Sequence, residues 1–328
     1  LAVVSQLAVA TMVVTADAAT AAVEPADVAA RLHFVTCSVI FTKLRSVASL
    51  DIIVATLFGA QNPKLAQSAA HYVEVSGSSS VVAALTSPML QHSLYPPWKR
   101  FLRARERLRA DLRPCIGTAV LSDTLEPEAL LDNLVTLLIA GHETTAHAIV
   151  WSLYDLLHNP STLTRLLEDI DSLSSDATLN EIDALPYLEA VCQETLRRHP
   201  VVVGVTRVLR TPMDVCGHVL PEGVSVSPSA SLVHERADLY PEPEVFRPER
   251  FLERKYTGFE NLPFGGGANR CPGAGFAFAE MKLTLFYLLR QWSLELCDER
   301  PVKPVVRGLV MVPARRIEVT VQHRNTQS

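Results

Sequence analysis

The longest helical pattern in the chain runs from Pro127 to Leu157 and constrains the fold more than any other segment. Apolar residues cover most sides of this pattern, so the helix that it predicts must be surrounded by other elements. The chain has 328 residues, of which 48% are hydrophobic, and it can therefore bury a large core around such a helix. We expect a mainly α-helical protein with one central, buried helix and a small β part.

A polar interruption lies in the middle of this helix, at Ala140-Gly-His-Glu-Thr-Thr145. Burial makes polar side chains costly unless hydrogen bonds or function compensate. His142 and Glu143 followed by His147 look like a zinc-protease helix, but that helix needs histidines four residues apart. Here they are five apart, which places them about 140° apart around the helix axis. Hydrogen bonding of the two threonine hydroxyls to helix carbonyls is the structural alternative.

A glycine-rich loop with one cysteine, Pro263-Phe-Gly-Gly-Gly-Ala-Asn-Arg-Cys-Pro-Gly273, precedes a second apolar run that ends at Trp292. Glycines allow a sharp turn and a close approach to a flat ligand. Pro272 suits the first position of the following helix, which would place Cys271 at its amino end, where backbone N–H groups stabilise a thiolate. A buried structural thiol is the alternative for a cysteine taken alone. The spacing excludes a P-loop and a dinucleotide fingerprint.

A further helix is predicted from Leu185 to His199, where Pro200 ends it. Glu194 and Arg197 lie three residues apart on one face of this helix and can pair. The pair taken alone would contribute little on a surface.

Short β-strands are expected after this helix. Val201 to Val226 is rich in β-forming residues, with Pro221-Glu-Gly223 as the turn between two strands. Three prolines make Leu239 to Phe251 an irregular connector, and alternating residues from Val302 to Gln322 predict a closing hairpin.

Four segments, taken in their order along the chain, resemble the cytochrome P-450 family: A-G-x-E-T-T, E-x-x-R, P-E-R-F and the cysteine loop F-G-G-G-A-N-R-C-P-G. One position departs from the family pattern, because Asn269 stands where a basic residue is expected and Arg270 follows it. The resemblance implies the cytochrome P-450 fold, a helical domain around haem with small β-sheets, and a haem-dependent monooxygenase. The wording of the cysteine loop looks most like bacterial members that act on apolar substrates.

The resemblance also implies roles for individual residues. Cys271 would be the proximal iron ligand of haem b, and Glu143 and Thr144 would be the catalytic pair that supplies protons for O2 activation. Arg207 would bind a haem propionate. The other residues expected to bind the cofactor are Ala140, Gly141, Phe264, Gly265, Gly267 and Gly273. Glu194, Arg197 and Arg250 would form a buried structural cluster that steadies the cysteine loop.

Electrons would come from a ferredoxin or a flavoprotein reductase fed by NAD(P)H, because the chain has no flavin or nicotinamide motif. O2 and an apolar small molecule would be the substrates. Two alternatives stay open. One is a peroxide-using or lipid-rearranging member of the same fold. The other is a truncated or decayed relative without enzymatic activity, because the W-x-x-x-R helix typical of the family is missing.

We expect one partial cytochrome P-450 domain over residues 1–328, with substrate-side and surface helices in 1–126 and the haem-binding core in 127–328. Helices are predicted up to about residue 60 and over Leu65–Val75, followed by a linker-like stretch at Gly77–Ser80. Trp98–Arg113 predicts a basic helix. A solvated helix face is the simpler interpretation of its charges, and a membrane surface or an acidic partner is the alternative.

Composition narrows the class further. A net charge of −5 gives no reason to expect nucleic-acid binding. The six cysteines are scattered without a C-x-x-C pair, which favours reduced thiols and a cytoplasmic location. The apolar stretch that starts at Leu1 is interrupted by polar residues and favours a buried helix over a signal peptide or membrane anchor, although an anchor could precede Leu1.

Overall fold

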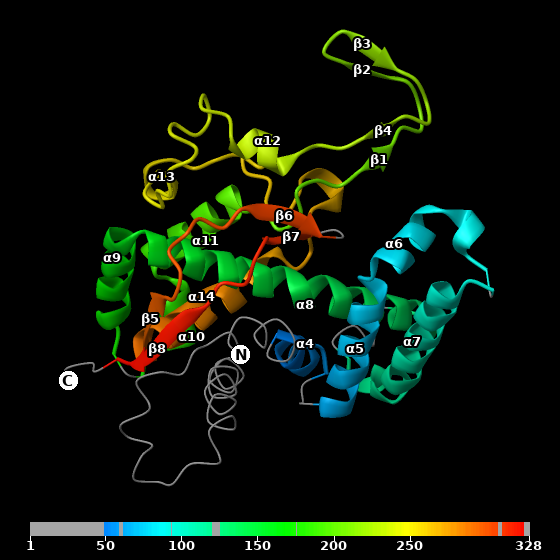
Figure 1. Cartoon of the computed structure of the whole chain (residues 1–328), viewed down its shortest axis with the longest axis horizontal. Coiled ribbons are helices and arrows are strands. Elements are labelled where there is room, and N and C mark those ends of the chain that lie inside the picture. The colour runs from blue at the N-terminus through cyan, green and yellow to red at the C-terminus, as the bar shows by residue number, and fades with distance from the viewer. Residues whose placement is uncertain are drawn as a thin grey trace.

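The computed structural model describes residues 49–58, 62–92, 94–119, 125–174, 176–307 and 310–324. Within these ranges the chain is mainly helical, with four two-stranded antiparallel sheets (Figure 1). This confirms the predicted fold class. The predictions for the apolar amino-terminal stretch and for most of the first 60 residues fall outside the described residues. No helix in the described ranges is long and apolar enough to cross a membrane.

Helix α8 (Pro127–His158) runs through the centre of the molecule, as predicted (Figure 1). Two hydrophobic cores share it. The amino-terminal half, including Leu130 and Leu138, belongs to one core, and the carboxyl-terminal half, including Trp151 and Leu156, belongs to the other. The polar interruption at 140–145 lies between these two stretches of α8.

The first core lies among the helices that precede α8. Besides α8 it is built mainly from α4 (Ser49–Phe58), α5 (Pro63–Ser76) and α7 (Pro96–Leu112). Between α5 and α7 lie α6 (Ser79–Thr86) and the short 3-10 helix η2 (Pro88–Leu90), and η3 (Arg113–Thr118) follows α7. The prediction of a linker at Gly77–Ser80 was wrong: α5 ends at Ser76 and α6 begins at Ser79, so the serines start a helix.

The second core lies among the helices that follow. Its main helices besides α8 are α9 (Pro160–Asp171), α11 (Pro186–Arg198) and α14 (Ala274–Gln291). Proline occupies the first position of α8, α9 and α11, where its missing N–H would have no helical partner. Short helices complete this part of the chain: α10 (Leu179–Asp183), α12 (Ala230–His234), α13 (Arg250–Glu253) and the 3-10 helix η4 (Gly267–Asn269).

A nested hairpin projects from the body between α11 and α12 (Figure 1). Its strands are β1 (Arg207–Val208), β2 (Met213–Val215), β3 (His218–Leu220) and β4 (Ser225–Val226), with β1 paired to β4 and β2 to β3. The predicted turn at Pro221–Gly223 is confirmed: it lies between β3 and β4, and Gly223 has a φ of 84°. A second turn, which was not predicted, joins β2 to β3 at Cys216 and Gly217, with φ of 55° and 84°.

Two further sheets close the chain. The predicted terminal hairpin is confirmed for β6 (Pro304–Arg307) and β7 (Val310–Pro313). The last strand, β8 (Val319–His323), does not join that hairpin. It pairs instead with β5 (Trp292–Leu296), which follows α14 directly. Long-range pairing of this kind depends on how α14 packs and has no local sequence signal.

Candidate functional site

The cysteine loop, residues 263–273, is shaped by its glycines. Gly265 and Gly267 have φ of +71° and +69°, in the left-handed region that other residues rarely adopt. These two turns bring the loop back on itself, so that the backbone N–H of Cys271 donates a hydrogen bond to the carbonyl of Phe264 at 2.9 Å. The loop is therefore a closed turn with the cysteine at its exit.

Cys271 is exposed and forms no disulfide. The prediction that Pro272 is the first residue of the following helix was wrong. Helix α14 begins at Ala274 with Gly273 as its amino-terminal cap residue, so Cys271 lies three residues before the first helical residue. A β-carbon added at Gly273 would lie 3.8 Å from the Cys271 sulfur, an ordinary contact.

Phe264 anchors the loop on α14. Its ring packs against Phe278 with a centroid distance of 5.3 Å and joins the edge of the second core. A pocket of about 410 Å³ lies beside these two rings and is also lined by Arg270 of the loop and by Glu189 and Gln193 of α11.

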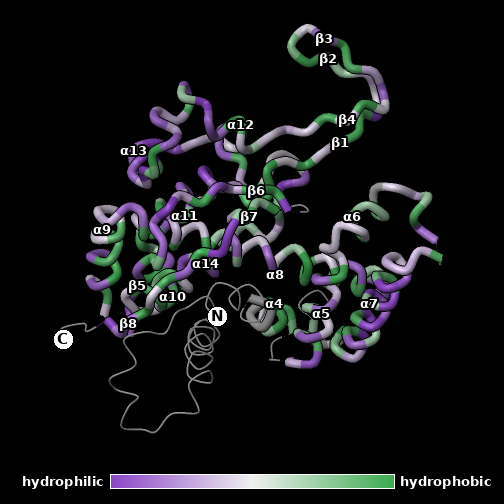
Figure 2. Tube along the Cα trace, viewed as in Figure 1, coloured by the Kyte–Doolittle hydropathy of each residue, from purple (hydrophilic) through white to green (hydrophobic). Residues whose placement is uncertain are grey.

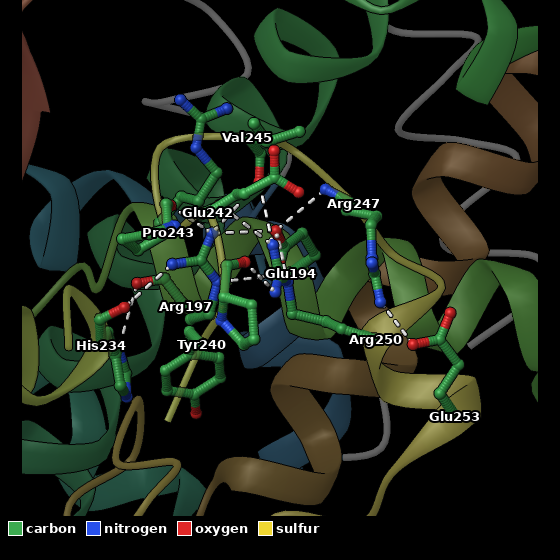
Figure 3. Close-up of polar contacts among 12 residues, drawn as sticks. Glu194, Arg197, His234, Tyr240, Glu242, Pro243, Val245, Arg247, Arg250 and Glu253 are labelled. Atoms are coloured by element: carbon green, nitrogen blue, oxygen red, sulfur yellow. Dashed lines mark hydrogen bonds and ion pairs between the residues drawn. The ribbon is translucent and has the colours of Figure 1, made fainter. Parts of the chain in front are cut away.

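The charge cluster, Glu194 with Arg197 and Arg250, is buried, and each residue is at most 2% exposed (Figure 3). The Glu194 carboxylate accepts two hydrogen bonds from Arg197, at 2.7 and 2.8 Å, and one from Arg250 at 3.1 Å. The backbone N–H of Arg247 donates to it at 3.0 Å. The structure therefore brings together the three residues that the E-x-x-R and P-E-R-F segments predicted.

Two guanidinium groups and one carboxylate leave the charge cluster with a net positive charge. Backbone carbonyls compensate: Arg197 donates to the carbonyls of His234 and Pro243, and Arg250 donates to that of Pro241 (Figure 3). The carbonyl of Glu242 also accepts from Arg250, at 3.4 Å, and Glu242 has the uncommon φ of +50°. The connector over 239–251 is thus irregular because it folds around the two arginines.

His234 connects the charge cluster to the cysteine loop. Its Nδ1 lies 3.0 Å from the carbonyl of Arg197, and its Nε2 accepts a hydrogen bond from the backbone N–H of Leu262 at 2.9 Å. Since Nε2 accepts, Nδ1 carries the proton and donates to the carbonyl, which defines a neutral imidazole. Burial lowers the pKa of His234 to about 4. Leu262 precedes the first residue of the loop, so this histidine fixes where the loop begins.

Sequence reasoning missed His234. The only available signal was its place in the short pattern S-A-S-L-V-H, where Ser229 caps α12 by accepting from the N–H of Leu232. Nothing in that pattern indicates that both ring nitrogens are used, because their partners come from Arg197 and Leu262, 37 and 28 residues away.

The hexad at 140–145 continues the α8 helix without a break. The Thr144 hydroxyl donates to the carbonyl of Ala140 at 2.6 Å, which is the back-bonding that the sequence left open as an alternative. A β-carbon added at Gly141 would lie 2.2 Å from the Cδ1 atom of Ile53 on α4. A larger residue here would make the end of the Ile53 side chain shift, so the glycine favours the close packing of α4 on α8.

Arg207 lies on the projecting hairpin. Its side chain is exposed and donates to the neighbouring carbonyl of Thr206 at 3.1 Å. Among the described residues, no hydrogen bond or salt bridge joins Arg207 to the cysteine loop. The structure thus connects the charge cluster with the loop through His234, whereas Arg207 lies on the projecting hairpin.

These features define a class of helical protein with a central helix, a cysteine loop shaped by glycines and a buried Glu–Arg–Arg cluster that His234 connects to the start of the loop. The family model described as Cytochrome P450 matches residues 113–321, which include all of them. The chain belongs to the cytochrome P450 family.

Relatives of known name agree with this assignment. The Mycobacterium tuberculosis (strain ATCC 25618 / H37Rv) protein that carries the name cytochrome P450 135B1 is 34% identical over 300 residues, which cover 84% of this chain and 62% of the relative. Cytochrome P450 135A1 of the same strain is 32% identical, with 81% and 62% covered. Cytochrome P450 3A12 of Canis lupus familiaris is 30% identical, with 68% and 47% covered. The chain spans less than two thirds of the length of these relatives.

The residues around Cys271 fit the haem group that the family implies. The thiol forms no disulfide and is exposed, so it is accessible to a metal ion. A β-carbon added at Gly265 or Gly267 would meet no atom within 4 Å, so open space lies beside the loop where a flat group could approach the backbone. Asn269 and Arg270 are both exposed on the same loop.

Proposed function

We propose that this chain carries the haem-thiolate centre of a monooxygenase, with Cys271 as the iron ligand. Haem b, when bound, supplies the activation of O2 that allows one oxygen atom to enter an organic substrate. The observation that carries the proposal is the exposed, unpaired cysteine on a loop that His234 ties to the buried charge cluster. The alternative, a structural thiol, would be expected in the core, and Cys271 does not lie there.

The loop residues shape the ligand site. Gly265 and Gly267 give the backbone its left-handed turns, Gly273 lies next to the sulfur, and Phe264 holds the loop against α14. Arg207 is our candidate for binding a propionate of the cofactor. Its guanidinium is exposed and donates a hydrogen bond to the neighbouring carbonyl of Thr206, and a propionate could take the place of that carbonyl.

On α8, Ala140 and Gly141 are the candidates for lying beside bound O2, and Glu143 and Thr144 for moving protons. Because the Thr144 hydroxyl donates its proton to the Ala140 carbonyl, its lone pairs remain able to accept a hydrogen bond from a group beside the helix. Glu143 is half-buried, so its carboxyl can exchange protons with solvent.

The Thr144→Ala variant tests this proton role. We expect product formed per O2 consumed to fall by roughly tenfold or more, because general acid catalysis of this kind contributes at least that much. Thr136→Ala is the matched control. The Thr136 hydroxyl donates to the carbonyl of Asp132 at 2.8 Å in the same way, and Thr136 lies on the same helix about one turn before the hexad. Equal coupling of O2 use to product in both variants would remove Thr144 from the proton path.

The proposed substrates are O2 and an apolar small molecule, with electrons from a ferredoxin or flavoprotein reductase fed by NAD(P)H. Turnover that needs peroxide and no reductase would instead favour the peroxide-using alternative. A purified protein that is folded but colourless after haem supplementation would favour a relative without enzymatic activity.

The reduced carbon-monoxide difference spectrum of the haem-loaded chain is the deciding experiment. Thiolate ligation gives a strongly red-shifted Soret band. We expect that band, and its absence in a haem-loaded, folded protein would overturn the assignment of Cys271.

A further inference from the structure

Helix α7 has a basic face that neither the fold nor the proposed site uses. We define the α7 basic face as Lys99, Arg100, Arg103 and Arg107, all of them exposed. At 100° per residue these positions span about 100° of the helix surface. The opposite side of α7 is buried in the first core and carries Phe101, Ala104, Leu108 and Leu112.

The side chains of the α7 basic face are weakly compensated, with Asp111 as the acid that interacts electrostatically with Arg107. Within the described ranges, no hydrogen bond or salt bridge joins any of them to a carboxylate. Other arginines nearby are paired: Arg109 bonds to Glu128 and Asp132 of α8, and Arg113 bonds to Glu128. Asp111, at one edge of the face, is already held by Lys64 and Ser68, and Glu106, at the other edge, adds one exposed negative charge.

Two large, exposed apolar side chains lie in the segment that leads into α7. Met89, in η2, is 85% exposed, and Leu94, two residues before α7, is 86% exposed. Figure 1 places α6 and α7 together at one end of the molecule, and Figure 2 shows α7 as predominantly hydrophilic there. Exposed apolar side chains next to charged ones are typical of surfaces that bind a partner or a membrane, and a helix face that only contacts water does not explain them.

A small notch adjoins the same place. It has a volume of about 140 Å³ and is lined by Ser78, Ser80, Pro96, Pro97 and Arg100. The lining thus offers hydroxyl groups and one guanidinium together, which is the chemistry that holds a phosphate oxygen.

We propose that this end of the molecule binds the surface of a membrane that contains anionic phospholipids. Met89 and Leu94 enter the boundary between headgroups and acyl chains, and the α7 basic face contacts the lipid phosphates. The charges and the apolar residues act together, since one weak signal alone gives only marginal, reversible attachment. The whole chain has a net charge of −5, so general attraction does not bring it to an anionic surface and the local face must do so.

Vesicle binding by the full chain tests the proposal. Sedimentation is measured with vesicles of phosphatidylcholine plus phosphatidylserine and with vesicles of phosphatidylcholine alone. The Lys99→Glu/Arg103→Glu/Arg107→Glu variant should bind the anionic vesicles about a hundredfold more weakly, since each cation near such a surface contributes about fivefold. The matched control, Arg210→Glu/Lys255→Glu/Lys303→Glu, makes the same change in net charge at three other exposed positions and should bind within about twofold of the unchanged chain.

A second variant separates the apolar contribution. Met89→Ser/Leu94→Ser keeps every charge, and we expect it to weaken binding at high salt, where the electrostatic attraction is screened. Equal losses in the two charge-reversal variants, or no preference of the unchanged chain for phosphatidylserine, would overturn the proposal. So would charge-sensitive binding to a soluble polyanion such as polyglutamate that matches the vesicle affinity, because an acidic protein partner would then explain the face. Circular dichroism of each variant shows whether the fold is kept.

Discussion

Glu194 lies in a cluster from which solvent is excluded, whereas Cys271 is exposed on a loop that the same cluster reaches through His234. The charge cluster is held together by side-chain hydrogen bonds, which two arginines donate to one carboxylate and to several backbone carbonyls. The cysteine loop is held by its backbone, because two glycines adopt conformations closed to other residues. The first region is built to stay in place, and the second is built to leave a thiol accessible.

This difference predicts how the two regions respond to substitution. Removing an arginine of the charge cluster takes a donor from the Glu194 carboxylate and from buried backbone carbonyls, and should mainly reduce the stability of the fold. Substitutions in the cysteine loop leave the core unchanged and should mainly alter what binds there.

The largest effect is expected for Arg250→Ala. The Glu194 carboxylate would lose one of its two arginines, and the carbonyls of Pro241 and Glu242 would lose their donor. We expect the free energy of unfolding to fall by about 3–5 kcal/mol, measured by urea denaturation.

Arg254→Ala is the control for that variant, because Arg254 pairs with Glu260 at the surface, where it is 45% exposed. An exposed pair of this kind contributes less than about 1 kcal/mol. Similar losses in the two variants would mean that burial does not distinguish the charge cluster from an ordinary surface pair.

The connection between the two regions should be sensitive to acid. The pKa of His234 is about 4 in the folded protein and 6.5 when unfolded, so between these values the unfolded state binds the extra proton. Stability from this group is present above pH 6.5 and is lost as the pH falls toward 4, by up to about 3 kcal/mol.

His234→Gln removes the titrating group and keeps a donor and an acceptor. We expect this variant to be less stable than the unchanged chain at pH 7 and to approach it as the pH falls to 5. Urea midpoints at several pH values measure the gap, and a gap that stays constant with pH would exclude His234 as the titrating group.

A smaller effect is expected for Gly265→Ala. The added methyl group meets no atom within 4 Å, so the cost comes only from holding alanine at φ of +71°, about 1–2 kcal/mol. Gly258→Ala is the control, because it also has open space but lacks a positive φ, and it should be neutral or slightly stabilising. Differential scanning calorimetry compares the two, and equal melting temperatures would show that the loop does not depend on this turn.

The sequence predicted well those features that depend on local pattern. The bounds of α8 and α11 were correct within one residue, because apolar periodicity and flanking prolines are both local signals. The members of the charge cluster were found through a resemblance that spans 56 residues, from Glu194 to Arg250. Their actual geometry, with the connector folded around them, could not be read from that resemblance.

What could not be predicted depends on tertiary packing. The turn at Cys216-Gly217 was missed because the neighbouring turn at Pro221-Glu-Gly223 has the stronger local turn chemistry, and only the pairing of β2 with β3 shows the first turn. Likewise, β8 pairs with β5 and does not extend the β6–β7 hairpin that precedes it. His234 was missed because its two partners meet only when α11, α12 and the start of the cysteine loop are assembled.

The smallest effect on stability is expected for Cys271→Ser, although it removes the proposed ligand. The side chain is exposed, and substitution of an exposed residue usually changes the free energy of unfolding by less than about 0.5 kcal/mol. The thiolate Soret band should nevertheless disappear. Cys297→Ser, at another exposed cysteine, should keep both the stability and the band. A large loss of stability in Cys271→Ser without haem would mean that the thiol supports the fold itself, and the contrast between a structural cluster and an accessible loop would then fail at the residue on which it depends most.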